Sequence, residues 1–365
     1  MNKIKTQGIK YTGSKLKLLP HILSLAKQLN VSSILDGFSG TTRVSQAFAQ
    51  NGFCVTSNDI AEYSYIFGQC YLLNKELPTK YAELIEHLEH LQGYDGWFTQ
   101  YYGGIDHQGS AIQADGTKKP WQIHNTRKLD AIREEIDRLT LTPIERAVAL
   151  TSLILALDEV DNTLGHFTSY LKNWSARSYK TMKLKVPELF INQQQNHVYQ
   201  NDIFQTISDK QFDLAYFDPP YGSNNQKMPS SRVRYASYYH LWETICKNDH
   251  PPLFGVANRR QDSSDKTNKN IFEDFHQDTD GNYIAAKAID CLVEKTQAHY
   301  IALSYSSGGK ATAQELDQIL HKHGKLIQTI EISYEKNIMS KMKWTNEWLR
   351  EAETPNKEFI FLIEK

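Results

Sequence analysis

Strands and helices alternate along both ends of this 365-residue chain, and this alternation restricts the fold more than any other feature of the sequence. Apolar residues recur at helical spacing over Ser14–Leu29, and a short β-prone run follows at Ser32–Leu35. The pattern then predicts a helix over Thr41–Gln50, a strand over Phe53–Ser57 and a helix over Glu62–Leu73. This order is typical of one half of a doubly wound α/β sheet.

The pattern changes in the middle of the chain. Residues 75–196 contain helical signals joined by long polar loops, and the predicted helices are Tyr81–Leu91, Ile123–Leu139 and Pro143–Val160. Between the first two, Gly93–Gln122 is rich in glycine and aromatic residues without any period, which predicts a long functional or disordered loop. We therefore expect 75–196 to form a mainly helical domain, inserted into a sheet domain made of 1–74 and 197–365.

Alternation resumes after residue 196. The predicted strands are His197–Gln200, Phe212–Phe217, Tyr300–Ser304, Leu326–Ile332 and Glu358–Ile363, and the predicted helices are Tyr238–Lys247, Tyr283–Lys295 and Ala313–His323. A chain of this length can form one large α/β core together with an inserted domain. The expected fold class is therefore α/β, with a Rossmann-like sheet and a mainly helical insertion.

Composition limits the functions that remain. The formal net charge is −1, so any nucleic-acid site must be a local basic patch. The four cysteines have no spacing typical of a zinc site and suit reduced thiols of a cytosolic protein. The N-terminus lacks the apolar stretch of a signal peptide, and no apolar run is long enough to span a membrane. We expect a cytoplasmic protein without a membrane partner.

The predicted strand Phe212–Phe217 ends in the tetrapeptide Asp218, Pro219, Pro220 and Tyr221. The prolines stop the strand at the edge where open α/β sheets bind ligands. The carboxylate of Asp218 and the carbonyl of Pro219 could accept both N–H groups of an exocyclic amine, and Tyr221 could stack on a flipped base. The alternative is a proline turn that only ends the strand. If functional, these four residues suit methylation of an amine.

Asp36-Gly37-Phe38-Ser39-Gly40-Thr41-Thr42 lies between a predicted strand and a predicted helix. Its glycines allow a ligand to approach the backbone, and the following helix offers free N–H groups. We therefore predict that Asp36, Phe38 and Gly40 contribute to a cofactor site. Only two glycines are present, so the segment is not a full dinucleotide fingerprint, and a tight strand–helix turn is the alternative.

Three more segments could complete a cofactor site. Asp59, at the end of the second strand, could bind ribose hydroxyls, or it could cap the next helix. Tyr11 could pack on an adenosyl group and Lys15 could pair with a carboxylate, although Ser14 is also an ordinary N-cap residue. Asp202 could accept from a purine amine with Ile203 against its ring, or it could form an Asx turn.

Taken in this order, the segments resemble the Dam-like α-group of adenine-specific DNA methyltransferases, and within it the branch that accompanies type IIS restriction enzymes. The matching segments are Lys10–Lys15, Asp36–Thr41, Asp59, Asp202, Asp218–Tyr221, Ser231–Tyr235, Tyr238–Ile245 and Asn162–Lys172. Tyr-Thr-Gly-Ser-Lys stands where many members have Trp-Ala-Gly-Gly-Lys, and Gly-Thr-Thr stands where Gly-x-Gly is common.

The resemblance implies a sheet that binds S-adenosylmethionine, with Tyr11, Lys15, Asp36, Phe38, Gly40, Asp59, Asp202 and Ile203 as cofactor residues. It implies methylation of the adenine amine within a short sequence of duplex DNA, with Asp218–Tyr221 as the catalytic motif and no metal. A cognate restriction endonuclease is a possible partner, and an orphan methylase is the other possibility.

Candidate DNA contacts follow from the charge pattern. The segment from His166 to Lys185 interleaves aromatic and basic residues, among them Lys172, Arg177 and Lys180. Basic groups of this kind contact phosphates, although a solvated charged face is the alternative. Arg232 and Arg234, close after Tyr221, could hold the backbone beside a flipped adenine.

Two rival functions remain open at this point. One is methylation of guanine in ribosomal RNA, against which the N-terminal Lys10–Lys15 segment and the large insertion argue. The other is a catalytically inactive DNA-binding regulator, against which the intact Asp218 and Tyr221 argue.

Overall fold

The computed structural model describes residues 5–222, 234–264, 270–274, 276–309, 311–333 and 357–365. Within them the helices are α1 Leu19–Gln28, α2 Arg43–Gln50, α3 Glu62–Gly68, α4 Ala82–Glu89, α5 Trp97–Tyr102, α6 Ile123–Arg138, α7 Pro143–Val160, α8 Ile203–Ser208, α9 Tyr235–Tyr238, α10 His240–Lys247, α11 Ile284–Lys295 and α12 Ala313–His323. The strands are β1 Ser33–Asp36, β2 Cys54–Asn58, β3 Gly103–Gly104, β4 Trp121–Gln122, β5 His197–Tyr199, β6 Phe212–Phe217, β7 Leu253–Phe254, β8 Arg259–Arg260, β9 Ala298–Ser306, β10 Lys325–Ser333 and β11 Lys357–Glu364.

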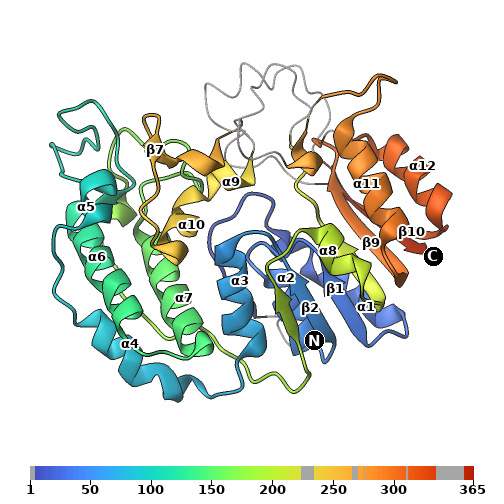
Figure 1. The fold of residues 1–365 in the computed structure, drawn as a ribbon, viewed down its shortest axis with the longest axis horizontal. Coiled ribbons are helices and arrows are strands. Elements are labelled where there is room, and N and C mark those ends of the chain that lie inside the picture. The colour runs from blue at the N-terminus through green and yellow to red at the C-terminus, as the bar shows by residue number, and fades with distance from the viewer. Residues whose placement is uncertain (1–4, 223–233, 265–269, 275, 310, 334–356) are drawn as a thin grey trace.

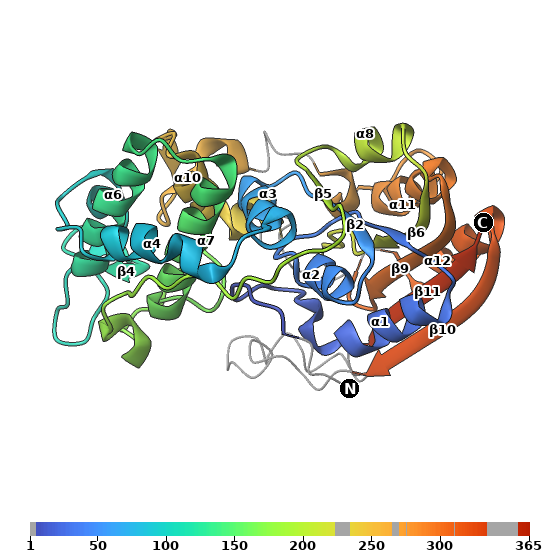
Figure 2. The ribbon, with the colours of Figure 1, turned by 90° about the horizontal axis from the view of Figure 1, so that it is seen from below.

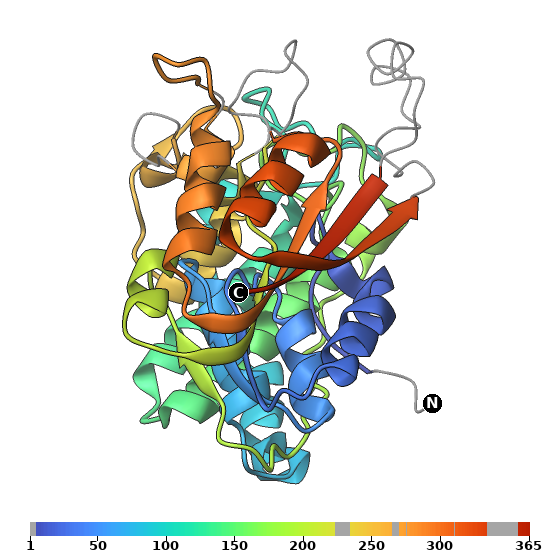
Figure 3. The ribbon, with the colours of Figure 1, turned by 90° about the vertical axis from the view of Figure 1, so that its right-hand side faces the viewer.

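A central sheet in the order β10-β11-β9-β6-β1-β2-β5 organises the molecule (Figure 1). The neighbouring strands β5, β2, β1, β6 and β9 run parallel, whereas β11 is antiparallel to both β9 and β10. Figure 3 looks onto this antiparallel end of the sheet, where the C-terminus lies. The mostly parallel α/β sheet expected from the sequence is confirmed, and the predicted strands differ from the observed ones mainly at their ends.

Both faces of the sheet are covered by helices. On one face α1 and α2 pack on inward-facing residues such as Ile34 and Leu214, and on the other α8, α11 and α12 pack on residues such as Leu35 and Ala215. Figure 2 shows α8 and α11 on the opposite side of the strands from α1 and α2. Because β1 and β6 are buried on both faces, their central residues, Ile34 and Leu35 in β1 and 214–217 in β6, are consecutive apolar residues without polar alternation.

A second core lies beside the sheet. Residues of α4, α5, α6 and α7 share this core with α3 of the sheet domain and with α9 and α10, which follow the Asp218–Tyr221 motif. Trp242 of α10 packs on Phe167 in a T-shaped contact with ring centroids 4.8 Å apart, and on Trp121 at 5.9 Å. α7 begins with a capping box between Thr142 and Glu145, and Pro143 lies in its first turn, which agrees with the helix start predicted from the sequence. This helical layer therefore combines 75–196 with residues from both flanking parts of the chain.

Several elements differ from the sequence prediction. Gly93–Gln122 is not a continuous loop, because it contains α5 and the short parallel strands β3 and β4. The predicted helix Ser14–Leu29 is a 3₁₀ turn at Lys15–Lys17 followed by α1. The sequence also gave no signal for α8 or for the β7–β8 hairpin, because each is short. No helix in the described ranges is long and apolar enough to cross a membrane.

We expect Arg133→Met to lower the free energy of unfolding by about 3 kcal/mol. Arg133 is fully buried, and its Nε and Nη2 donate to the carbonyls of Ile245 and Cys246 at the end of α10, at 2.6 and 3.1 Å. The substitution leaves both carbonyls without these donors. Arg138→Met is the control, because Arg138 on the same helix is 70% exposed in its ion pair with Glu135. Urea denaturation should separate the variants, and equal losses would contradict the proposed role of Arg133.

Candidate active site

The parallel strands bring most of the candidate residues to one edge of the sheet. β1 ends at Asp36, β2 ends just before Asp59 and β6 ends just before Asp218, and β1 pairs with both other strands. A cavity of about 460 Å³ lies over this edge. Its lining includes the predicted cofactor residues Tyr11, Lys15, Asp36, Phe38, Gly40, Asp59, Asp202 and Ile203, as well as Asp218 and Pro220. A volume of this size suits a drug-sized or cofactor-sized molecule.

The Gly-rich turn after β1 is held by Asp59. Gly40 has a φ of +49°, and its N–H donates to Asp59 Oδ2 at 2.8 Å, while the N–H of Ala61 donates to Oδ1 at 3.0 Å. A side chain at Gly40 would meet the ring of Tyr11 at 3.2 Å, so the turn and the aromatic ring fit closely. Asp59 does not cap α3, because the N-cap of α3 is Ala61 and that cap has no side-chain hydrogen bond. Its carboxylate instead holds the Gly-rich turn and lines the cavity.

Asp36 brings an unsatisfied acceptor to the site. It is 1% exposed, its Oδ2 accepts from Ser45 Oγ at 2.6 Å, and its buried Oδ1 has no hydrogen-bond partner. Burial raises the pKa of Asp36 to about 7, although the hydrogen bond from Ser45 lowers it. A buried acceptor without a donor is costly, which suits a ligand that donates into the cavity.

Lys15 connects the two sides of the site. Its ammonium is 6% exposed and forms ion pairs with Asp218 Oδ1 at 2.9 Å and with Glu358 of β11. Burial alone would lower the pKa of Lys15, but the charges of Asp218 and Glu358 hold it well above its ordinary value. Burial also raises the pKa of Asp218, an effect that Lys15 opposes. Lys15 thus pairs with two carboxylates of the protein itself, and nothing in the sequence indicated Glu358.

A cluster of tyrosines, of which the sequence analysis named only Tyr11 as a cofactor residue, completes one wall. Tyr11 stacks on Tyr239 with ring centroids 4.3 Å apart, and its hydroxyl lies 3.2 Å from that of Tyr63. The hydroxyl of Tyr239 accepts from the N–H of Thr12 at 2.6 Å, and the hydroxyl of Tyr235 donates to the Thr12 carbonyl at 3.1 Å. These contacts fix the N-terminal segment against α9 and α10. The sequence could not reveal this cluster, because its tyrosines come from three segments that are far apart along the chain.

On the opposite wall, Asp202 and Phe38 flank the cavity. Asp202 is exposed and caps α8, since its Oδ1 accepts from the N–H of Phe204 at 2.9 Å. Ile203 is buried beside the turn after β1, where a side chain on Gly37 would meet Ile203 at 3.0 Å. The ring of Phe38 contacts Phe272 edge-on at 5.1 Å. Phe272 is therefore a further aromatic of this wall that the sequence did not indicate.

Tyr221 lies beside the buried charges. Its ring centroid is 5.5 Å from Lys15 Nζ and 5.3 Å from the ring of Tyr305. Burial raises the pKa of Tyr221, and the nearby Lys15 opposes that rise, so the phenol remains neutral near pH 7. The motif thus places an aromatic ring and a carboxylate around one ammonium group.

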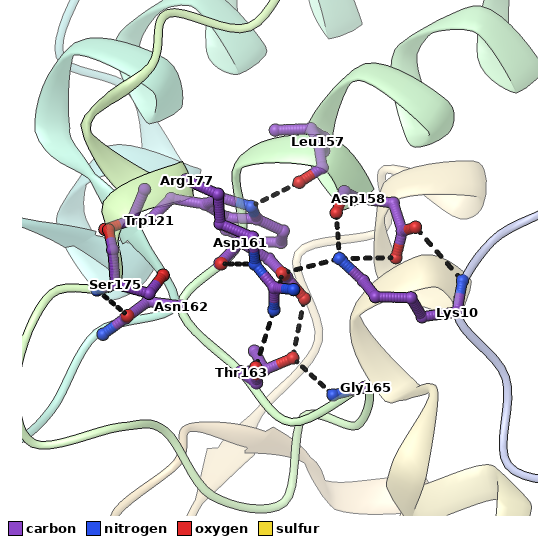
Figure 4. A network of polar contacts seen from close by, with 11 residues as sticks. Lys10, Trp121, Leu157, Asp158, Asp161, Asn162, Thr163, Gly165, Ser175 and Arg177 are labelled. Atoms are coloured by element: carbon purple, nitrogen blue, oxygen red, sulfur yellow. Dashed lines mark hydrogen bonds and ion pairs between the residues drawn. The ribbon is translucent and has the colours of Figure 1, made fainter. Parts of the chain in front are cut away.

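The candidate DNA contacts fall into different environments. Lys172 and Lys180 are exposed, whereas Arg234 is only 7% exposed and does not present a surface phosphate contact here. Arg177 lies in the polar network of Figure 4, where its Nη2 pairs with Asp161 at 2.6 Å and its Nε donates to the Asp161 carbonyl at 2.7 Å. Arg232 lies outside the described residues.

The network in Figure 4 also reaches the N-terminal segment. Asp161 is 1% exposed and pairs with Lys10 at 2.9 Å as well as with Arg177. The backbone N–H of Lys10 donates to Asp158 Oδ2 at 3.1 Å. Lys10 therefore joins the N-terminal segment, which reaches the cavity at Tyr11 and Lys15, to the end of α7.

In the described part of the chain, no cluster of three or more histidine, cysteine or acidic side chains could hold a metal ion.

A doubly wound sheet with an acidic and aromatic cavity at its carboxyl edge defines a class of proteins that bind nucleotide-like ligands. Residues 11–306 match the sequence profile of the D12 class N6 adenine-specific DNA methyltransferases. Because this match spans most of the sequence, the chain belongs to that family, whose members are enzymes.

Curated relatives agree with this assignment. The chain is 30% identical to modification methylase StsI of Streptococcus sanguinis over 86% of its own length and 46% of that protein. It is 27% identical to the type II methyltransferase M.FokI of Planomicrobium okeanokoites, over 98% of the chain and 53% of the relative. It is 28% identical to M.NlaIII of Neisseria lactamica, over 87% and 90% respectively. The chain thus spans about half the length of StsI and M.FokI, but most of M.NlaIII.

We expect Asp36→Asn to become progressively more stable than the wild-type protein as pH rises from about 4 to about 7. The raised pKa means that folded Asp36 binds its proton more tightly than the unfolded chain does, so the wild type loses stability over this interval. The amide cannot ionise and avoids that loss. Urea denaturation at several pH values should show the difference growing up to about pH 7 and then levelling off.

Asp213→Asn is the contrasting control. Burial favours a higher pKa for Asp213, but hydrogen bonds from Ser32 and Ser33 outweigh it and lower the pKa to about 2. Its stability difference from the wild type should therefore stay constant between about pH 4 and 7. A constant difference for Asp36→Asn as well would show that Asp36 is not perturbed.

Proposed function

We propose that this protein is a site-specific DNA methyltransferase that uses S-adenosylmethionine to methylate the exocyclic amine of adenine in duplex DNA. The observation that carries the proposal is the Asp218–Tyr221 motif at the carboxyl end of β6, beside a cavity that suits a cofactor. Family membership supports both the reaction and the base. A DNA substrate would place the protein in the cytoplasm.

The cavity residues suit the cofactor. S-adenosylmethionine supplies a methyl group activated by its positively charged sulfonium. We propose that Asp59 binds the ribose hydroxyls, that Asp202 accepts from the adenine amine and that Phe38 and Ile203 pack on the adenine ring. The unpaired Oδ1 of Asp36 would accept from a donor on the ligand, and Gly40 allows the Tyr11 ring to pack against the turn. Tyr11 closes the opposite wall, and Lys15 aligns the catalytic carboxylate.

Asp218 and Pro219 would orient the target amine. An adenine amine is a poor nucleophile because its lone pair is delocalised into the ring. Hydrogen bonds from both of its N–H groups to the Asp218 carboxylate and the Pro219 carbonyl would favour a tetrahedral nitrogen, with its lone pair directed at the methyl group. The stiff turn at Pro219 and Pro220 keeps the acceptors in place, and Tyr221 would stack on the flipped base.

We propose that residues 75–196, between 1–74 and 197–365, dock on DNA as the target-recognition domain. Exposed Lys172 and Lys180 are the best placed of the candidates to contact phosphates. Arg177 and Arg234 would act from within the protein, Arg177 by fixing the loop after α7 and Arg234 at the start of α9. The type II relatives support a restriction–modification context, with a cognate endonuclease as a possible partner.

We expect Asp218→Ala to reduce methyl transfer by about a hundredfold or more while largely sparing DNA binding. The wild type and the variant should be incubated with unmodified DNA and cofactor that carries tritium in its methyl group, and the modified bases then identified. Asp209→Ala, which removes an exposed acid after α8, is the matched control. Label in cytosine, in RNA only, or none in adenine would reject the proposed function. Single-molecule sequencing of DNA from cells that express the chain would report the base and the recognition sequence together.

We expect Lys15→Met to move the acidic limb of the pH–activity profile upward by about 1–3 pH units. Asp218 must be ionised to accept from the amine, and Lys15 opposes the rise in its pKa that burial causes. Without the ammonium, Asp218 also lies near the uncompensated charge of Glu358. Lys17→Met, which changes an exposed lysine two residues away, should leave the profile in place. A profile that keeps its position in Lys15→Met would remove Lys15 from the proposed mechanism.

A further inference from the structure

An exposed valine stands at the tip of a hairpin near the active site. The β7–β8 hairpin connects Leu253–Phe254 to Arg259–Arg260 through the residues 255–258. Val256 is 80% exposed, the highest fraction among the exposed large hydrophobic residues of the described chain. Single exposed apolar side chains are common on protein surfaces, so the position and the rigidity of the hairpin are what distinguish Val256.

The rest of this hairpin is firmly held. Buried Tyr102 donates its hydroxyl to the Asn258 carbonyl at 2.7 Å, and buried Tyr170 donates to the Ala257 carbonyl at 2.8 Å. At the base, Arg260 pairs with Asp249 at 2.7 Å and with Asp262 at 2.6 Å. The tip also contains two residues with positive φ, Gly255 at +70° and Asn258 at +50°. Val256 is thus presented on a backbone that has little freedom left to lose on binding.

The hairpin leads directly into the proposed active site. Arg260 and Asp262, which follow the tip, line the same cavity as Asp218. Arg260 follows Val256 by four residues, and even a fully extended chain of that length would keep the tip within about 13 Å of Arg260 at the cavity wall. Figure 1 shows β7 and α9 at the same end of the molecule, the end to which the parallel strands point. A duplex held over the cavity would therefore meet the hairpin.

Basic and apolar side chains lie on the hairpin and on the segments that are hydrogen-bonded to it. Tyr170, which holds Ala257, is two residues from exposed Lys172, and the Lys172 carbonyl accepts from the N–H of Ala111 at 2.8 Å. The next residue, Ile112, is also exposed, and Arg259 of the hairpin lies over the Phe254 ring with its guanidinium 4.5 Å from the centroid. An apolar tip beside cations is the combination that proteins use to enter a DNA groove while holding the phosphates.

We infer that Val256 is a wedge that enters the duplex and contacts the bases next to the flipped adenine. The buried hydrogen bonds from Tyr102 and Tyr170 keep the tip rigid, so it can displace stacked bases without deforming. Contact with neighbouring bases would stabilise the gap that the flipped nucleotide leaves. This role rests on the proposed function, because it requires duplex DNA over the cavity.

The test uses Val256→Ser, Val256→Leu and, as a matched control, Leu77→Ser, which changes a residue 60% exposed near α4 at the far end of the helical layer. The substrate is a duplex that carries the site identified by single-molecule sequencing, with 2-aminopurine in place of the target adenine for fluorescence measurements of flipping. For methyl transfer to the natural duplex, Val256→Ser should lower kcat/KM about tenfold and reduce the flipping signal. Val256→Leu should stay within about twofold of the wild type because it keeps an apolar side chain at the tip.

Cofactor affinity and the thermal unfolding midpoint should be the same in all variants, since Val256 touches neither the cavity nor a core. If Val256→Ser matches Leu77→Ser in kcat/KM and in flipping, the wedge is refuted. A tip that binds a protein partner instead of DNA would give this same result. If the wild-type protein methylates no adenine in DNA, the proposed function itself fails, and the two failures are therefore distinguishable.

Discussion

The buried ammonium of Lys15 is the interaction on which the rest of the site depends. It pairs with Asp218 at the end of β6 and with Glu358 on β11, and both carboxylates are mostly buried. Two carboxylates this close would repel each other and favour protonation without the cation between them. The ion pairs also determine where the N-terminal segment can lie. One charge therefore favours the ionised form of Asp218 and fixes one wall of the cavity.

The segment that carries Lys15 is a connector between the two cores. At its start, Lys10 pairs with Asp161 behind α7, and Thr12 is hydrogen-bonded by Tyr235 and Tyr239 of the helical layer. At its end, Lys15 reaches the sheet. The helical layer and the sheet consequently meet across the cavity. Under the proposed function, the segment Lys10–Lys15 contacts both the part that docks on DNA and the part that holds the cofactor.

Local sequence accounts for most of the sheet and for one side of the site. β1 and β6 contain consecutive apolar residues, and β2 contains the β-branched Val55 and Thr56. Glycine, acid or proline marks the end of each strand, so both the strands and the acids at their ends could be predicted. Parallel pairing then guarantees that these acids meet. The short elements could not be predicted, because α8 and the β7–β8 hairpin have too few residues to show a period.

The sequence by itself determined the chemistry available: an acid–proline–proline–tyrosine motif, a Gly-rich turn and several acids at strand ends. Only the tertiary structure decided which groups share an environment. It placed Glu358 beside Lys15, 343 residues away along the chain, and engaged Arg177 with a buried Asp161. It also left Val256 in solvent. The reason is that residue types and short periods are local properties, whereas burial and charge pairing depend on contacts between segments far apart in the sequence.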